Sequence, residues 1–352
     1  MQHPRDVLLG AQSAPAALPV CDHYCGVEVR MRKSLELQAE MMHEFGACVF
    51  DVTLDCEDGA PVGGERDHAQ LALALARDAV ARARAASARV MPRIAVRVHP
   101  VNHSAFDEDI EILAGSGIGC WSHLMVPKVE SVCDVDRVVA ALAAAVGPAG
   151  RTLPVHVLVE SAAAVHRVFE LAAHPRVQSV SFGLMDFVSA HGGAIPLSGM
   201  QAEGQFSHPL VLRAKLAIAA ACHASAKVPS HCVVTEYRDA AVVRRAARTA
   251  ASSLGFLRMW SIHPSQIRPI LEAFAPDAGE VAAAADIIQA AEQARWAPIS
   301  LGGQLHDRAS YRFFWQILER AHRTGQRLPD GVSRYFDACP IQETRRDGPS
   351  IA

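Results

Sequence analysis

The chain has 352 residues, of which 50% are hydrophobic and 20% are charged. Its 34 lysines and arginines nearly balance 37 aspartates and glutamates, which gives a formal net charge of −3 and argues against a protein that coats nucleic acid. This composition can bury a sizeable core, so disorder is excluded for most of the chain, and the length fits either two domains or one large barrel.

The sequence shows no sign of a membrane span or of a secretory signal. No apolar run approaches the roughly 18 residues that a membrane helix requires, and the start of the chain lacks a basic stretch followed by an apolar block. We therefore expect a soluble, cytoplasmic protein without a membrane partner. The nine cysteines are scattered and include no C-x-x-C pair, so neither a disulfide framework nor a zinc site is expected.

Short β-rich runs alternate with segments that are rich in alanine, leucine and arginine. The predicted strands cover residues 18–24, 47–54, 93–98, 122–127, 154–160, 178–183, 231–236 and 256–262. The predicted helices between them cover residues 31–45, 67–90, 106–116, 132–146, 162–174, 209–226 and 239–254. Runs such as ACVF (47–50) and VLV (157–159) are continuously apolar, which is typical of parallel strands buried on both faces.

This alternation predicts an α/β fold, a (β/α)8 TIM barrel, because eight strand–helix units in about 260 residues match its usual size. A doubly wound open sheet is the rival, but no G-x-G-x-x-G sequence follows the first strand. Beyond the last strand the pattern predicts helices only, over residues 264–274, 278–295 and 306–323, with a glycine-bearing link at 300–304. We predict a flexible N-terminus (1–17), a barrel (18–275), a C-terminal helical extension (276–326) and a tail (327–352).

Carboxylates follow several of the predicted strands. In such a barrel the loops after the strands converge at one end, where catalytic residues lie. Asp55, Glu57 and Asp58 follow the second strand, Glu160 ends the fifth, and Asp186 follows the sixth. Glu160 and Asp186 can point into one site and suit Mg²⁺, which keeps positions free for water and a bidentate substrate. Position alone is equally compatible with capping and loop roles for both residues.

One arginine lies inside a predicted strand. Arg97 stands in an apolar run, where an unpaired charge is costly, so it requires an anionic partner. That partner is Glu57 or Asp58 on the neighbouring strand end, or a substrate carbonyl oxygen, and a purely structural ion pair is the alternative. Asp55 is expected to cap or pin its loop, and His263 is expected to have a structural role at the start of a helix.

Seven segments carry a family pattern in register along the chain. They are FDVTLDCEDGAP (50–61), AVRVHP (95–100), MVPKVES (125–131), LVESAAAV (158–165), SFGLMDF (181–187), LGF (254–256) and SIHPSQI (261–267). Together they resemble the citrate lyase β-subunit and malyl-CoA lyase family, within the HpcH/HpaI aldolase group. The resemblance runs from about residue 30 to residue 325. It implies a (β/α)8 barrel with a C-terminal helical extension and Mg²⁺-dependent cleavage or formation of a carbon–carbon bond next to a carbonyl.

The resemblance also implies roles for single residues. Glu160 and Asp186 match the family's metal ligands. Arg97 matches the arginine that contacts the substrate carbonyl and the enolate. Glu57 and Asp58 match the acidic pair that orients this arginine and the metal-bound water.

A further segment implies a shared site. GGQLHDRASYR (302–312) resembles the family's C-terminal segment, whose aspartate reaches a neighbouring subunit's active site, and here that residue is Asp307. In cleavage, Arg97 and the metal would stabilise the oxyanion of the enolate, and Asp307 would give a proton to its carbon. The implied partners are an acyl-CoA or a hydroxy or keto acid substrate, and further copies of the chain in a homotrimer or homohexamer.

Departures from the family pattern concern the substrate. Arg258 and Met259 replace the Gly-Lys of many relatives, so a contact to CoA phosphates is expected to be lost or taken over by Arg258. His99 stands near an asparagine of the family and is a candidate substrate contact, and Gly183 and Met185 are further candidates.

Three functions remain open. The first is a Mg²⁺-dependent lyase that cleaves a 3-hydroxyacyl-CoA such as malyl-, citramalyl- or citryl-CoA through an enolate. The second is an aldolase on free 4-hydroxy-2-keto acids, which needs no CoA groove and which the missing lysine at position 259 favours. The third is a catalytically silent barrel subunit, against which stands the presence of every expected catalytic residue type. A thioesterase step after cleavage is also compatible with the sequence.

Overall fold

The computed structural model describes residues 3–10, 18–115, 117–147 and 150–337. The chain divides into two compact units, one formed by Pro19–Ala275 and the other by Met1–Leu18 together with Pro276–Ala352. Each unit has a hydrophobic core of its own. No helix in the described ranges is long and apolar enough to cross a membrane.

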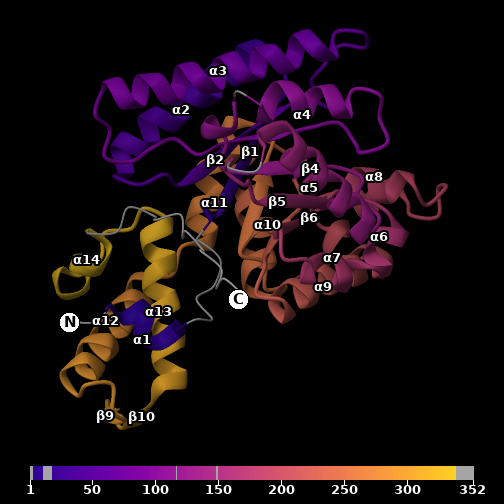
Figure 1. Cartoon of the computed structure of the whole chain (residues 1–352). Coiled ribbons are helices and arrows are strands. Elements are labelled where there is room, and N and C mark those ends of the chain that lie inside the picture. Colours follow the sequence, from indigo (N-terminus) through magenta and orange to yellow (C-terminus); the bar gives the residue numbers. More distant parts are fainter. Residues whose placement is uncertain (1–2, 11–17, 116, 148–149, 338–352) are drawn as a thin grey trace, which may run out of the picture. The chain divides into compact units, whose positions relative to one another are not determined.

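Eight parallel strands close the first unit into a barrel (Figure 1). Each strand pairs with the next one in the chain, and the last pairs with the first. The strands are β1 (Cys21–Cys25), β2 (Phe50–Asp55), β3 (Ile94–Arg97), β4 (Leu124–Val126), β5 (Val155–Val159), β6 (Val177–Phe182), β7 (Val228–His231) and β8 (Arg258–Ser261). The predicted (β/α)8 barrel is confirmed.

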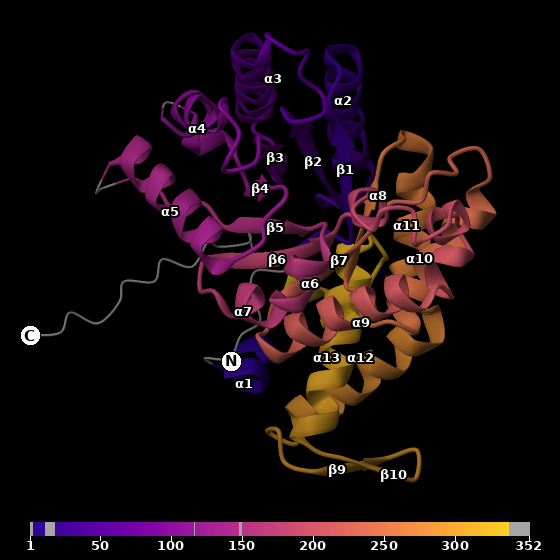
Figure 2. The ribbon, with the colours of Figure 1, turned by 90° about the vertical axis from the view of Figure 1, so that its right-hand side faces the viewer.

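Helices follow the strands and surround them (Figure 2). They are α2 (Glu28–Phe45), α3 (Glu65–Ala85), α4 (Phe106–Ala114), α5 (Val132–Val146), α6 (Ala162–His166), α7 (Val168–Ala173), α8 (Leu184–Ser189), α9 (Pro209–Ala224), α10 (Ala240–Ser252) and α11 (Ile267–Phe274). Local sequence sets several of their starts, because Ser161 and Asp239 accept hydrogen bonds from the first turns of α6 and α10. Proline opens α9, where its missing N–H costs nothing.

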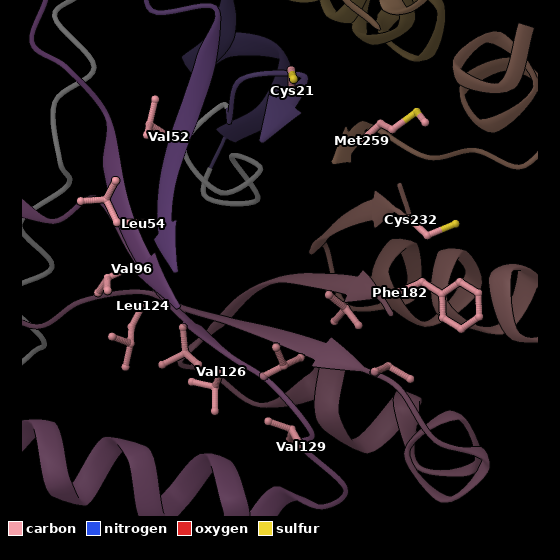
Figure 3. Close-up of a cluster of buried hydrophobic side chains, with 14 of the residues drawn as sticks. Cys21, Val52, Leu54, Val96, Leu124, Val126, Val129, Phe182, Cys232 and Met259 are labelled. Carbon is pink, nitrogen blue, oxygen red and sulfur yellow. The ribbon is translucent and has the colours of Figure 1, made fainter. Parts of the chain in front are cut away.

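Side chains alternate along each strand between the helix layer and the barrel interior. In β2, Val52 and Leu54 belong to the main core, and Figure 3 shows them among other buried apolar side chains. The residues that alternate with them along the strand make polar contacts with residues of other strands instead; they are Asp51, Thr53 and Asp55. The interior therefore carries the polar residues.

The interior is layered, as β5 illustrates. His156, Leu158 and Glu160 follow one another at steps of two residues, so they face the same side at successive heights. Leu158 belongs to a cluster, called the apolar layer below, that consists of Tyr24, Met125, Leu158 and Trp260. This layer separates a polar cluster at the start of the strands from another at their carboxyl ends.

The second unit is mainly helical. It contains α1 (Pro4–Leu9), α12 (Ala278–Gln293), α13 (Arg308–Arg323), α14 (Asp330–Asp337) and a hairpin of β9 (Ile299–Leu301) and β10 (Gln304–His306). Figures 1 and 2 both show α12 and α13 side by side, with the hairpin at one end. Its core includes Tyr311, Trp315 and Ile288, all buried.

Some details differ from the prediction. Residues 1–17 were expected to be flexible, but Pro4–Leu9 forms α1, in which proline lies near the helix start and Leu8 is buried in the core. α14 lies within the expected tail (327–352). The glycine-bearing link is a hairpin turn, because Gly302 and Gly303 adopt φ values of 60° and 78°, which two-residue turns favour. Residues 11–17 and 338–352 lie outside the described residues.

The seventh strand also lies earlier than expected. Residues 231–236 have a strand-like composition, but β7 is Val228–His231, which pairs with β6 and β8. After it, the carbonyl oxygens of Val234 and Glu236 accept hydrogen bonds from Gln266 Nε2 at 2.6 and 2.8 Å. The side chain of Gln266, rather than a neighbouring strand, therefore supplies the hydrogen bonds to the backbone of residues 234–236.

Candidate active site at the barrel mouth

Arg97, the last residue of β3, is held by three carboxylates. Asp55 ends β2 directly opposite, with 2.7 Å from Arg97 Nε to Asp55 Oδ1 and 2.7 Å from Nη2 to Oδ2. Glu57 Oε2 lies 2.7 Å from Nη1, and Asp58 Oδ2 lies 2.7 Å from Nη2. The hydrogen bonds to Asp55 and Asp58 use three of the five N–H groups of the guanidinium, and Nη1 makes an ion pair with Glu57. These contacts fix the orientation of a buried charge and leave Nη1 as the candidate donor to a substrate.

Glu57 and Asp58 thus contact Arg97, as the sequence predicts. Asp55 pins its loop as expected, since its Oδ1 accepts the backbone N–H of Glu57 at 3.0 Å. Its bidentate pairing with Arg97 was missed. The signal was present, because Asp55 and Arg97 both end neighbouring strands of a parallel pair.

Glu160 follows β5 and has a buried carboxylate. Its Oε2 accepts the backbone N–H of Lys128 at 2.7 Å, and Lys128 turns that N–H toward it with a positive φ of 53°. Burial, and then the charges of Asp186 and Glu57, raise the pKa of Glu160 to about 8. The backbone N–H of Lys128 and the charge of Arg97 lower this pKa, but by less than burial and the neighbouring carboxylates raise it.

Lys128 also connects Glu160 to the arginine site. Its Nζ lies 2.5 Å from Glu57 Oε1, while Glu57 contacts Arg97 through its other oxygen. Five carboxyl groups, of Asp55, Glu57, Asp58, Glu160 and Asp186, thus stand against two cationic side chains. This excess of acidic groups favours a bound dication.

Asp186 lies in the first turn of α8, is exposed, and acts on Glu160 through its charge. Hard carboxylate oxygens at adjacent strand ends, one of them buried and raised in pKa, fit Mg²⁺. Met185, on the same turn, is exposed, and its contact with a substrate stays a prediction.

Gly183 provides the space that Glu160 occupies. A Cβ atom on Gly183 would lie 2.4 Å from Glu160 Cγ and 2.6 Å from its Oε1. We expect Gly183→Ala to displace this carboxylate and to weaken Mg²⁺ affinity by about tenfold or more, as measured by calorimetric titration. Gly119→Ala is the matched control, because a Cβ there meets nothing within 4 Å. Equal Mg²⁺ affinity in the two variants would show that Glu160 is not a ligand in this position.

The raised pKa of Glu160 predicts a pH-dependent stability of the metal-free protein. The folded state binds this proton with a pKa of about 8, against the ordinary glutamate value of 4.5, so the free energy of unfolding falls as the pH rises from about 4.5 through about 8. Glu160→Gln cannot ionise and should exceed the wild type in stability at pH 8.5 by about 2 kcal/mol or more. Urea unfolding in EDTA at pH 5 and pH 8.5 measures this difference, and a difference that does not grow with pH would contradict it.

Aromatic residues form the floor of the site. The Arg97 Cζ atom lies 5.1 Å from the centre of the Tyr24 ring, and that ring stacks on Trp260 at 4.1 Å. Trp260 Nε1 donates to Ser181 Oγ at 3.0 Å, which fixes the indole. Tyr24 was not identified from the sequence, because only the closure of β1 onto β8 brings it to Trp260.

His99 lies just after β3 and is tied to α4. Its backbone N–H donates to Asp109 Oδ2 at 2.9 Å, and its Nδ1 lies 2.7 Å from the same oxygen. Burial disfavours the charged imidazole, but the hydrogen bond to Asp109 and the charge of Asp109 outweigh it, so the pKa of His99 is raised. A substrate contact by His99 stays a prediction.

Arg258 does not have the predicted role. Its side chain is fully buried in the barrel interior, with Nη2 2.8 Å from Asp51 Oδ2 and 3.2 Å from Asp22 Oδ2. Of the two alternatives for the contact to CoA phosphates, its takeover by Arg258 is therefore wrong. As the first residue of β8 it points inward, two residues before Trp260 on the same face.

Asp307 belongs to the second unit. It is exposed and caps α13, because its Oδ1 accepts the backbone N–H groups of Ala309 and Ser310 at 2.9 and 3.2 Å. These bonds use only one of its two carboxylate oxygens. A role for Asp307 in a neighbouring subunit's site stays a prediction.

Comparison with known proteins decides the family. Residues 35–264 match the HpcH/HpaI aldolase/citrate lyase family. The chain belongs to this family. The family resemblance seen in the sequence is confirmed.

Two relatives of this HpcH/HpaI family member are named as a lyase and as a citrate lyase subunit beta-like protein. It is 32% identical over 214 residues to the L-malyl-CoA/beta-methylmalyl-CoA lyase of Rhodobacter capsulatus, which covers 57% of this chain and 67% of the relative. It is 28% identical over 265 residues to a citrate lyase subunit beta-like protein of Deinococcus radiodurans, which covers 73% of this chain and 84% of the relative. These relatives support a carbon–carbon lyase.

Solved structures share the architecture. A citrate lyase from Burkholderia xenovorans LB400 is 44% identical, with a TM-score of 0.75, and the match covers 96% of this chain and 100% of that one. The protein CitE from Mycobacterium tuberculosis, solved with magnesium, acetoacetate and coenzyme A, shares the fold at 22% identity with a TM-score of 0.62 over 87% of this chain and 99% of that one.

Proposed function

We propose that the barrel mouth is the active site of a Mg²⁺-dependent carbon–carbon lyase. Its substrate is a 3-hydroxyacyl-CoA such as malyl-, citramalyl- or citryl-CoA, which is cleaved through an enolate to a keto acid and an acyl-CoA. The observation that carries this proposal is the buried carboxyl group of Glu160, whose pKa is raised by burial, beside an arginine that three acids hold. The malyl-CoA lyase relative and the magnesium, acetoacetate and coenzyme A bound to CitE support it.

Glu160 and Asp186 would hold the metal, and Mg²⁺ supplies a Lewis acid that polarises the oxygen atoms of the substrate at the reacting centre. Glu160 would give up its proton to hold the ion, so the metal affinity of the site would fall at low pH. The backbone N–H of Lys128 keeps one carboxylate oxygen of Glu160 in place.

Arg97 would stabilise the negative charge that develops when the bond breaks. Its Nη1 is oriented before the substrate arrives, because Asp55, Glu57 and Asp58 hold the guanidinium in place. A preorganised donor to an oxyanion contributes about 3 kcal/mol to the stability of a transition state. The stacked ring of Tyr24 closes the site from below.

Asp307 would exchange the proton at the enolate carbon, reaching the site of a neighbouring subunit in a homotrimer or homohexamer. We expect Asp307→Asn, which can still cap α13, and Arg97→Met to be inactive alone. Mixed oligomers of the two should regain activity, because some sites then combine an intact Arg97 with an intact Asp307. Steady-state assays after co-expression measure this rescue. Failure of mixed oligomers to recover activity would exclude an Asp307 that acts between subunits.

Product analysis tests the substrate. Wild-type protein is incubated with malyl-CoA, citramalyl-CoA, citryl-CoA and free 4-hydroxy-2-keto acids, each with Mg²⁺ or with EDTA, and the products are identified by mass spectrometry. Release of an acyl-CoA only with Mg²⁺ supports the proposal, whereas a panel without metal-dependent products contradicts it.

An aldolase on free 4-hydroxy-2-keto acids is the second candidate. The observation that favours it is the burial of both Arg258 and Met259, because this segment then offers no basic group to CoA phosphates. Turnover of the free acids alone in the same panel would select this candidate.

A further inference from the structure

Lys215 on α9 is a fully buried lysine whose contacts among the described residues include no carboxylate. Its Nζ lies 2.7 Å from Gln205 Oε1 and 4.1 Å from the centre of the Phe206 ring, and the thiol of Cys232 lies beside it. A buried cation is normally paired with an anion. Without such a partner, burial lowers the pKa of Lys215 to about 8, so part of the population carries a neutral, nucleophilic amine.

The thiol of Cys232 lies against the same amide oxygen. Cys232 directly follows β7, is 1% exposed and belongs to the main core (Figure 3). Its Sγ donates to Gln205 Oε1 at 3.2 Å, and it also hydrogen-bonds to the side chain of Lys215. Gln205, in the turn Gly204–Phe206, is fully buried as well. One fixed acceptor therefore holds a nitrogen and a sulfur nucleophile next to each other.

Other buried thiols of the described chain have different neighbours. Cys21 donates to the hydroxyl of Ser261, and Cys222 on α9 interacts with the backbone of Val180. Neither a hydroxyl nor a peptide group matches the nucleophilicity of a neutral amine. The proposed lyase reaction uses neither Lys215 nor Cys232, so their pairing requires an explanation of its own.

The chemistry of the pair favours an oxidation. A thiol is oxidised first to a sulfenic acid, which then reacts with a neighbouring nucleophile. At Cys232 the neighbouring nucleophile is the amine of Lys215. Because both side chains are buried, the oxidant has to be small and uncharged, as hydrogen peroxide is, and it enters during local opening of the fold.

We propose that Lys215 and Cys232 are a modification site, at which hydrogen peroxide joins them through a covalent nitrogen–oxygen–sulfur bridge. First, the Cys232 sulfur attacks peroxide, the O–O bond breaks, and a sulfenic acid and one water form. Then a second peroxide accepts two electrons as Nζ bonds to the sulfenic oxygen, and two waters leave. The bridged pair has one oxygen more and two hydrogens fewer than the reduced pair, and excess dithiothreitol reverses both steps.

The bridge would tie α9 to the segment that follows β7. Gln205 Oε1 can still accept the N–H that remains on the bridged nitrogen, so the surroundings need little rearrangement. A covalent link between two segments restricts the unfolded chain. We therefore expect peroxide treatment to raise the Tm by a few degrees and dithiothreitol to restore the original value.

Peptide mapping of the wild-type protein tests the bridge, and it requires no lyase activity. The folded protein is treated with graded hydrogen peroxide in EDTA, denatured, alkylated, digested with trypsin and measured by mass spectrometry. We expect residues 214–227 and 228–238 to be linked, with one oxygen gained and two hydrogens lost, and without cleavage after Lys215. Cys232 that stays reduced, or reaches the sulfinic acid, while trypsin still cleaves after Lys215, overturns the bridge.

Variants separate the bridge from a disulfide. Cys222 lies in the same tryptic peptide as Lys215, and a disulfide between Cys222 and Cys232 would lose two hydrogens without gaining oxygen. Cys222→Ser is the matched control and should keep the bridge, whereas Lys215→Met and Cys232→Ser should lose it together with the rise in Tm. Loss of the link in Cys222→Ser, or its persistence in Lys215→Met, overturns the proposal. Should variants fail to fold, the mass of the wild-type link and the missed cleavage at Lys215 decide.

Discussion

Replacing Arg97 by methionine should reduce kcat by about 10²- to 10³-fold and also destabilise the barrel. The loss of activity follows from removing a fixed donor to the enolate oxygen, since a single oxyanion donor is worth about 10²- to 10³-fold in kcat. The loss of stability follows from leaving Asp55, Glu57 and Asp58 without their cation, and breaking a buried ion pair typically costs about 3–5 kcal/mol. Steady-state kinetics with Mg²⁺ and urea unfolding measure the two effects.

Two further substitutions sharpen this prediction. Arg97→Lys keeps the charge but not the planar fork that grips Asp55, so it should retain more stability than activity. Arg137→Met is the matched control, because Arg137 pairs with Asp107 on the exposed surface and should leave both quantities near wild type. Wild-type turnover by Arg97→Met would show that Arg97 is a structural ion pair only.

Glu160→Gln and Asp186→Asn should each weaken Mg²⁺ binding by on the order of 100-fold and abolish metal-dependent turnover. Both residues lie at strand ends outside the core, so the barrel should stay folded. Calorimetric titration with Mg²⁺ and circular dichroism measure binding and folding. Glu44→Gln serves as the control, since Glu44 pairs with Arg268 on the surface. Wild-type Mg²⁺ affinity in both mouth variants would refute the assignment of these ligands.

Much of the fold could be predicted because its signals are local. Continuous apolar runs of strand length mark strands buried on both faces, and carboxylates after β2, β5 and β6 mark the active end of a barrel. The seventh strand was misplaced because Val233 and Val234 have strand-like side chains, while the pairing that defines a strand depends on neighbours far away in the sequence.

The site could be predicted only in part, and for a related reason. A strand that is apolar on both faces conceals which residues point inward, so Arg258 was a candidate for a contact to CoA phosphates although it faces the interior. The cluster of Gln205, Lys215 and Cys232 draws its members from a turn, a helix and the end of a strand. Only the packing of α9 against β7 brings them together, and no spacing along the sequence indicates it.

Deuterium exchange tests the central claim, a metal-dependent enolate site at the mouth, most directly. Acetyl-CoA and pyruvate are each incubated with the protein in D₂O, with Mg²⁺ or with EDTA, and deuterium in their methyl groups is followed by mass spectrometry. We expect incorporation into at least one of them with Mg²⁺, none with EDTA, and none with Arg97→Met. Absence of exchange under all conditions, or exchange that EDTA and Arg97→Met leave unchanged, would contradict an enolate stabilised by Arg97 and a metal held by Glu160 and Asp186.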